Sequence, residues 1–394
     1  MKRIILTILL LGMSLPLFAG LDEDLMNAAK AGNHKKVKEL VANGADVNKR
    51  GNYGITALHY ATHRGDVKTV KYLLDNGANL KLGYYFGLTA LHIAVRNRNI
   101  KMTTYLIKRE ADVNAKNDHR VTVLHFAAEY GNLVLVKILL LNGANINGAN
   151  YSGSTVLHYA ARGGNLDVVK YLITKGLDVH TKDNNDMSVL HSAAFGGNLD
   201  IVKFLINYGV DIYAKDKHKK TVLHEAVDGG NREIVKYLIT KGSNHISKDS
   251  EGNTALIIAA ENGYVDIVKL FLESKSHIND QNKLGQTALH MAVRERIIAV
   301  VENEYLKKII RDLRRNNKSV SFTQTREVSH VDELAPKREI KKKSVVSFFL
   351  VAKLLLKYGA RVNVRDKDGK TPLDMARSEN MKKLLKKHGA KSGK

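Results

Sequence analysis

The chain has 394 residues, of which 44% are hydrophobic, and it carries a formal net charge of +24. A hydrophobic fraction of this size excludes a wholly disordered chain. The sequence contains no cysteine, which excludes disulfides, thiolate metal sites and a cysteine nucleophile.

The first twenty residues have the order of a secretory signal peptide. Two basic residues precede an apolar run at 4–13, and Pro16 and Ala19 follow it. The run is shorter than the ~20 apolar residues of a membrane-spanning helix, and no later segment supplies that length. We therefore expect residues 1–19 to be cleaved, leaving a secreted or periplasmic protein with no transmembrane span.

From residue 56 onward the sequence repeats itself every 33 residues. The repeated fragment, TALHYA in its first copy, begins at 56, 89, 122, 155, 188, 221, 254 and 287. A degenerate copy precedes it at Glu23, and a later copy, TPLDMA, begins at Thr371. In most copies Thr or Ser can cap a helix, a glycine nine residues later can end it, and a second stretch such as LDVVKYLI has helical periodicity. The pattern predicts two short helices per repeat.

This 33-residue period, with T-x-L-H-x-A, Gly-Asn before the second helix and Gly-Ala-Asp-Val-Asn after it, resembles the ankyrin-repeat family. The resemblance covers about residues 22–297 and 349–394. It implies an all-α solenoid of about ten 33-residue helix-turn-helix repeats with β-turn fingers. The family's proline after the Thr is present only at Pro372. Arg98 and Glu110 stand where other copies have glycine, which predicts local backbone strain.

A 51-residue insertion interrupts the last part of the array at 298–348. Its first part is predicted to extend a helix and its second part to be mobile and basic. KSVSF at 318–322 resembles a docking peptide for the catalytic subunit of phosphatase-1, and PKREIKKK at 336–343 resembles a nuclear-import signal or polybasic tether; the alternative is a charged linker. The expected segments are therefore a signal peptide (1–19), repeats with a degenerate N-terminal cap (20–297), the insertion (298–348), and repeats with a basic C-terminal cap (349–394).

Seven histidines share one slot of the repeat. Stacked helices lie about 8–10 Å apart, whereas zinc–nitrogen bonds are about 2.0–2.1 Å long, so neighbouring slots cannot share a metal ion. In the ankyrin family this histidine bonds to the loop backbone and to the neighbouring Thr. We interpret as structural the set His59, His92, His125, His158, His191, His224 and His290.

The sequence contains no Walker loop, no H-E-x-x-H and no G-x-S-x-G motif. The Gly-Gly pairs at 163, 196 and 229 recur at the repeat period, which favours a structural role over phosphate binding. We therefore expect no enzymatic activity, no cofactor and no metal site.

The positive charge is concentrated in three places. The insertion has a net charge of +5, the tail at 380–394 has +6, and eight lysines share one slot of the second helix. The lysines are spaced by a repeat with no aromatic residues between them, a pattern that fits neither duplex phosphates nor a base-stacking platform. Nucleic acid is therefore not an expected partner, whereas an anionic membrane surface remains an alternative.

In the ankyrin family partners contact the finger tips and the exposed end of the first helix. Carried over to this sequence, those positions give Tyr53, His63, Arg64, Tyr85, Phe86, Arg96, His119, Tyr130, Tyr151, Arg162 and Phe195. Aromatic and Arg side chains are enriched at interfaces, and the same positions in later copies are polar. The sequence therefore predicts a monomeric scaffold that binds a protein partner through the concave face and finger tips of its N-terminal half, with Phe86, Arg96 and Tyr130 contributing most. The alternatives are a cell-envelope or membrane tether using the basic C-terminal patches, or an exported effector that interacts with a host.

Overall fold

The computed structural model describes residues 15–294 and 345–393. Its secondary structure is helical: these residues contain no β-strand, only isolated β-bridges in the loops between helix pairs. The predicted all-α repeat fold is confirmed at this level. The chain divides into two compact units, the first ending at Leu177 and the second beginning at Asp178.

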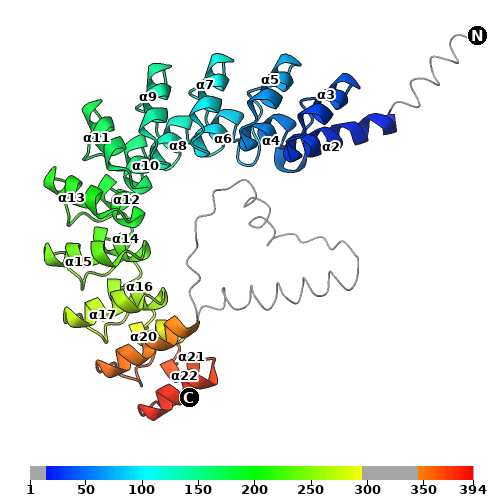
Figure 1. Ribbon diagram of the computed structural model, residues 1–394. Helices are drawn as coiled ribbons and strands as arrows, with labels where there is room; N and C mark the ends of the chain where they lie inside the picture. The colour runs from blue at the N-terminus through cyan, green and yellow to red at the C-terminus, as the bar shows by residue number, and fades with distance from the viewer. Residues whose placement is uncertain (1–14, 295–344, 394) are drawn as a thin grey trace, which may run out of the picture. The chain divides into compact units, whose positions relative to one another are not determined.

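In unit 1 the helices form two rows (Figure 1). The first helices of the pairs pack on one another in sequence, and most of the second helices also pack on a neighbouring second helix. The first row consists of α2 (Leu15–Ala31), α4 (Ala57–Arg64), α6 (Ala90–Arg96), α8 (Val123–Glu129) and α10 (Val156–Gly163). The second row consists of α3 (His34–Ala42), α5 (Val67–Asp75), α7 (Ile100–Lys108), α9 (Leu133–Leu141) and α11 (Leu166–Thr174).

Unit 2 repeats this arrangement. Its first helices are α12 (Val189–Gly196), α14 (Val222–Asp228), α16 (Ala255–Glu261), α18 (Ala288–Val293) and α21 (Pro372–Met375). Its second helices are α13 (Leu199–Asn207), α15 (Arg232–Thr240), α17 (Val265–Glu273), α20 (Val345–Lys357) and α22 (Glu379–Lys387). None of the helices in the described ranges has the length and apolar character needed to cross a membrane.

Local interactions determine where the helices of a pair begin and end. In α10 the N-cap is Thr155, and the helix ends at Gly164, whose φ of 85° is left-handed. The Asn165 side chain then accepts the backbone N–H of Val168 and starts α11. Buried Val, Leu and Ala side chains on the inner faces of both helices form a continuous core within each unit. Capping residues and apolar periodicity therefore determine the two helices of a pair, and the stacking of successive pairs buries their apolar faces.

Helix α20 packs against α17 and α18, the place that a second helix takes in the other pairs. It begins at Val345, three residues before the predicted end of the insertion at 348, and Phe348 in this extra turn is 4% exposed. The segment 295–344 lies outside the described residues, and with it both short motifs of the insertion. Residues 1–14, which make up most of the expected signal peptide, also lie outside them.

Candidate protein-binding surface of unit 1

We define a finger as the loop between successive helix pairs and its tip as the residues that precede the N-cap Thr. In fingers from 116 onward, isolated antiparallel bridges such as Lys116–Thr122 and Ala149–Thr155 close the loop. The tips are also linked to one another. The backbone N–H of Tyr85 donates to the carbonyl of Tyr53 at 2.9 Å, and the N–H of Tyr151 donates to the carbonyl of His119 at 3.1 Å. The predicted tip residues are therefore held at fixed spacing.

The aromatic side chains of the first tips form one continuous row. The rings of Tyr53 and Tyr85 meet edge to face at a centroid distance of 5.8 Å, and so do those of Tyr85 and Phe86 at 4.2 Å. The rings of Phe86 and His119 are tilted by 47° at a centroid distance of 5.1 Å. Tyr53 is 51% exposed and Phe86 is 47% exposed. Tyr151, in the next tip, is 65% exposed. The structure thus brings these five predicted residues to one edge of unit 1.

Three of these aromatics lie in the left-handed region of backbone space. The φ angles are 56° for Tyr53, 24° for Tyr85 and 58° for Phe86. A bulky residue with positive φ is strained, and glycine or asparagine would relieve that strain. In unit 1 the glycines that follow, Gly54 and Gly87, are left-handed as well. Two costs therefore coincide at these tips, backbone strain and solvent-exposed aromatic surface.

The predicted residues at the ends of the first helices lie in different environments. Arg64 and Arg162 are exposed, and Tyr130 is half-buried, stacked on Phe126 at 6.1 Å with an interplanar angle of 22°. His63 is half-buried beside Asn97, whose side-chain amide donates to the His63 carbonyl at 3.0 Å. Burial, together with the charges of nearby arginines, lowers the pKa of His63.

Arg96 does not lie on the surface as expected. Its side chain is 8% exposed, and its guanidinium donates to the hydroxyl of Tyr84 at 3.1 Å. Because Tyr84 is itself buried in the second finger, Arg96 supports that finger from within rather than reaching a partner. The expectation that Arg96 is an exposed contact residue is therefore corrected.

Phe195 lies in unit 2, apart from the other predicted contact residues in the chain. It is half-buried at the end of α12, and a Cβ on Gly229 would contact its carbonyl oxygen. The structure therefore groups the unit 1 residues of the prediction and leaves Phe195 as a separate position.

Sequence reasoning missed one aromatic row. The residue four places after the N-cap is aromatic in three copies of unit 1, as Tyr60, Phe126 and Tyr159. The Tyr159 hydroxyl accepts from the Asn150 side chain at 3.0 Å, and its ring lies 4.8 Å from that of His125. The recurrence of an aromatic residue directly after the repeated histidine was the signal that could have identified this row.

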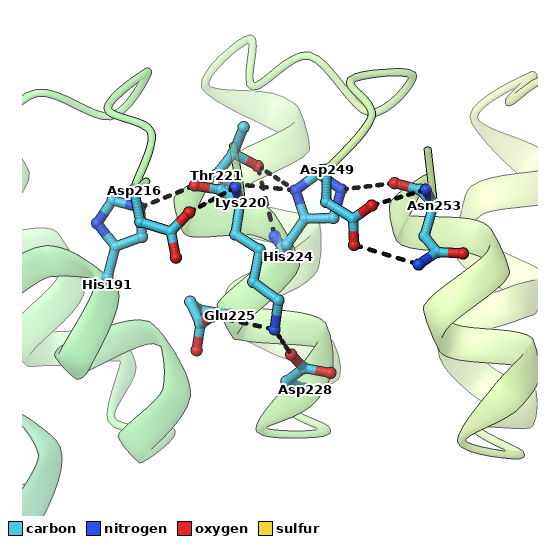
Figure 2. Close-up of polar contacts among 9 residues, drawn as sticks. All are labelled: His191, Asp216, Lys220, Thr221, His224, Glu225, Asp228, Asp249 and Asn253. Atoms are coloured by element: carbon cyan, nitrogen blue, oxygen red, sulfur yellow. Dashed lines mark hydrogen bonds and ion pairs between the residues drawn. The ribbon is translucent and has the colours of Figure 1, made fainter. Parts of the chain in front are cut away.

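The slot histidines are buried and hydrogen-bonded at both ring nitrogens in several copies. The backbone N–H of Thr221 donates to His224 Nδ1 at 3.1 Å, so the ring proton is on Nε2, which donates to the Asn253 carbonyl at 3.3 Å (Figure 2). His59 makes the same link to the Leu82 carbonyl at 3.0 Å. This geometry supports the structural interpretation, since the histidine accepts at the start of its own helix and, in the copies of His59, His191, His224 and His290, also binds a carbonyl of the next finger.

Burial keeps these histidines neutral. Desolvation lowers the pKa of His59, His92 and His125 to about 4, and it lowers the pKa of the corresponding histidines in unit 2 as well. In the last copy Asp374 replaces the histidine, and its carboxylate accepts the Thr371 N–H at 2.8 Å. Within residues 15–294 and 345–393, His, Asp and Glu side chains form no group of three that could hold a metal ion.

The lysines that share one position of the second helix do have aromatic neighbours, contrary to the sequence analysis. Lys137 Nζ lies 5.3 Å from the ring centroid of Tyr171, and Lys203 Nζ lies 5.9 Å from that of Tyr237. In each case the tyrosine is 34 residues further along, in the second helix of the next pair. These contacts are cation–π interactions along the outer row of second helices.

In the finger at 215–220 of unit 2, the residue that precedes the N-cap belongs to a charge cluster. Lys220 Nζ lies 2.6 Å from Asp228 Oδ2 and 3.5 Å from Glu225 Oε1 (Figure 2). Burial raises the pKa of Glu225, and the nearby Lys220 partly opposes this. The corresponding residues of unit 1 are Ile55, Leu88, Val121 and Ser154. This finger of unit 2 therefore carries a paired charge at a position where unit 1 has apolar residues or serine.

Paired helices stacked in two rows with tied fingers define a helical repeat protein. A family model described as ankyrin repeats in three copies matches residues 25–117, 102–183, 176–249 and 223–303. These matches cover well over half of the chain, which therefore belongs to the ankyrin-repeat family. Ankyrin repeats are in general protein–protein interaction modules, and the family consists of scaffolds that are generally not enzymes.

Comparison with curated proteins gives no match. Among solved structures, the crystal structure of the human ASB11 ankyrin repeat domain is similar to this chain, with 24% sequence identity and a TM-score of 0.49. The alignment covers 67% of this chain and 96% of that domain.

Proposed function

We propose that this protein is an interaction scaffold that binds a partner protein through the tips and first-helix ends of unit 1. The observation that carries the proposal is the row formed by Tyr53, Tyr85 and Phe86, three bulky residues held in left-handed backbone at exposed tips. A left-handed conformation costs a non-glycine residue roughly 1–2 kcal/mol. Exposed aromatic surface adds a risk of aggregation. Burial of the rings against a partner would offset both costs.

The decisive experiment uses a partner identified by affinity capture on the full chain and mass spectrometry. Binding of that purified partner is then measured by calorimetry for Phe86→Ala, Tyr130→Ala and Glu261→Ala. Central aromatic residues dominate interface energies, so the two aromatic variants should each lose about 2 kcal/mol or more of binding free energy. Glu261, in α16 of unit 2, is the control and should change little.

Circular dichroism and a urea titration establish that each variant remains folded before binding is compared. If Glu261→Ala abolishes binding while Phe86→Ala and Tyr130→Ala retain it, the site is in unit 2 and the proposal fails.

A second candidate function, attachment to an anionic membrane surface, is favoured by α22. Met381 and Leu385 are buried against the stack, while Lys383, Lys386 and Lys387 are exposed. A basic residue near an anionic surface contributes about 1 kcal/mol. The triple Lys→Gln variant should therefore reduce binding to phosphatidylserine vesicles by roughly 100-fold if α22 attaches the protein. Equal binding by variant and wild type removes this candidate.

We further propose secretion or periplasmic export through residues 1–19, and an array of about ten repeats interrupted between α18 and α20. The order of basic, apolar and small residues at the N-terminus supports the first proposal. N-terminal sequencing of exported protein should begin near Gly20; an intact Met1 on that protein would contradict it.

A further inference from the structure

We infer that the partner segment recognised by unit 1 is acidic, with carboxylates placed beside large apolar side chains. This inference rests on the proposed function and adds the chemical class of the partner. It is carried by arginines that lie among or beside the aromatic tips and that form no ion pair within residues 15–294 and 345–393.

The charged side chains of the unit 1 tips are mostly basic. The four tips at 50–55, 83–88, 116–121 and 149–154 contain the cations Arg50, Lys116 and Arg120 and a single carboxylate, Asp118. Arg64, at the end of α4, is exposed as well. A surface with this composition attracts carboxylates and disfavours basic segments.

The arginines are held in place by neutral groups. Arg50 Nη2 donates to the Gly83 carbonyl at 2.9 Å, and its guanidinium lies against Gly54, directly beside Tyr53. Arg64 Nη1 donates to the Lys30 carbonyl at 3.2 Å. Each guanidinium has five N–H donors, so one bond to a carbonyl leaves a pair free to bind a carboxylate.

Arg120 is positioned by an aromatic ring. Its guanidinium carbon lies 5.6 Å from the ring centroid of Tyr151, in the next tip. Across the described residues, Arg50, Arg64 and Arg120 form no ion pair. By contrast, Arg109 on the outer row binds Asp75 at 2.9 Å. Unit 1 therefore has pre-organised arginines at and beside its tips that form no ion pair with any described carboxylate.

The aromatic row determines the second property expected of the partner segment, its large apolar side chains. The rings of Tyr53, Tyr85 and Phe86 meet edge to face, so aliphatic or aromatic side chains of a partner can pack against ring surfaces between the arginines. Unit 2 does not offer this combination, because its tips at 182–187, 215–220, 248–253, 281–286 and 365–370 contain no Phe or Tyr. An acidic and apolar segment should therefore select unit 1.

The test is a selection of random 12-residue peptides displayed on phage with the full-length protein immobilised. The enriched peptides should be net negative and should contain large apolar residues. A synthetic copy of the most enriched peptide is then measured by fluorescence anisotropy against wild type, the triple variant Arg50→Gln, Arg64→Gln, Arg120→Gln, and the control Arg109→Gln. We expect about a 30-fold weaker affinity for the triple variant, a change within about twofold for the control, and weaker binding as salt is raised from 50 to 500 mM.

Enrichment of neutral or basic peptides, no enrichment at all, or undiminished binding by the triple variant overturns the inference. The proposed function is judged separately, by the captured partner. If Phe86→Ala and Tyr130→Ala lose that partner while the triple Arg variant keeps it, unit 1 is the binding site but its partner is not recognised by carboxylates.

Discussion

Nε2 of His290 donates to the carbonyl of Lys370 at 3.3 Å, although the two residues are 80 positions apart in the chain. The same bond joins His224 to the Asn253 carbonyl, at the same distance and a separation of 29. The divided pair of α18 and α20 is therefore linked to the following finger in the same way as an uninterrupted pair. The insertion divides one pair between its helices without changing how the fingers meet.

We predict that the insertion can be excised. Replacing 295–348 with the tripeptide Gly-Gly-Asn of 163–165 restores the 33-residue spacing between Thr287 and Thr371. The variant should keep its helical circular dichroism and lose about 2 kcal/mol of unfolding free energy, because the buried side chain of Phe348 is removed. Phe348→Ala in the full chain is the matched control. Aggregation, or a non-cooperative urea transition in the excised variant alone, would contradict the prediction.

Acid should destabilise unit 1 before carboxylates titrate. The pKa of His59, His92 and His125 is about 4 in the folded protein and 6.5 in the unfolded chain. Because the folded value is lower, the stabilisation is complete above pH 6.5 and is lost as the pH falls towards 4. At pH 5 each histidine should account for about 2 kcal/mol of lost unfolding free energy.

The measurement compares urea titrations at pH 7.5 and pH 5.0. His125→Gln should be less stable than wild type at pH 7.5 but should lose about 2 kcal/mol less between the two pH values. His180→Gln, at an exposed position, should follow wild type. An identical pH dependence for His125→Gln and wild type would show that protonation of this histidine does not limit stability.

The helix pairs could be predicted because they follow from a 33-residue period that the sequence displays directly, and the bonding role of the histidines because the period and its motifs resemble the ankyrin family. The left-handed backbone at Tyr53 and Phe86 could not be predicted. A turn that requires a positive φ is usually recognised by a glycine at that position, and here the residue is aromatic. The burial of Arg96 depends on the hydroxyl of Tyr84, 12 residues away, which no periodicity reveals. The contact between Lys137 and Tyr171 likewise joins neighbouring repeats, so it becomes visible only when they stack.

Backbone strain at three helix ends should be removable. Arg98, Glu110 and Lys275 have φ angles of 54°, 65° and 57° at positions where other copies have glycine, which bears out the expected strain at the first two. All three side chains are exposed. Replacing any one of them with Gly should raise the unfolding free energy by about 0.5–1 kcal/mol.

Gly176→Ala is the reciprocal control for these variants. Its φ is 93°, and an added Cβ would meet nothing within 4 Å, so the substitution isolates the backbone cost. It should destabilise by about 1 kcal/mol in the same urea titration. If the three glycine variants lower stability, the exposed side chains contribute more than the strain removes.

The charge cluster of unit 2 should depend on its lysine. Lys220 is 30% exposed, and it neutralises Asp228 and the buried Glu225 (Figure 2). Lys220→Met leaves both carboxylates without their cation, and breaking such a pair is costly because a buried charge stays uncompensated. We expect a loss of about 2 kcal/mol of unfolding free energy at pH 7.5, reduced from the fully buried case because the lysine is partly exposed.

The pH dependence of that loss separates charge from packing. Burial already raises the pKa of Glu225 above 4.5, and removing Lys220 should raise it further. A carboxyl group whose folded pKa is raised destabilises the fold at high pH and ceases to do so as the pH falls towards the unfolded value. The difference between Lys220→Met and wild type should therefore shrink from pH 7.5 to pH 4.5, with exposed Lys217→Met as the control. A difference that stays constant over this range would mean that Lys220 stabilises unit 2 through the packing of its hydrocarbon chain, not through its charge.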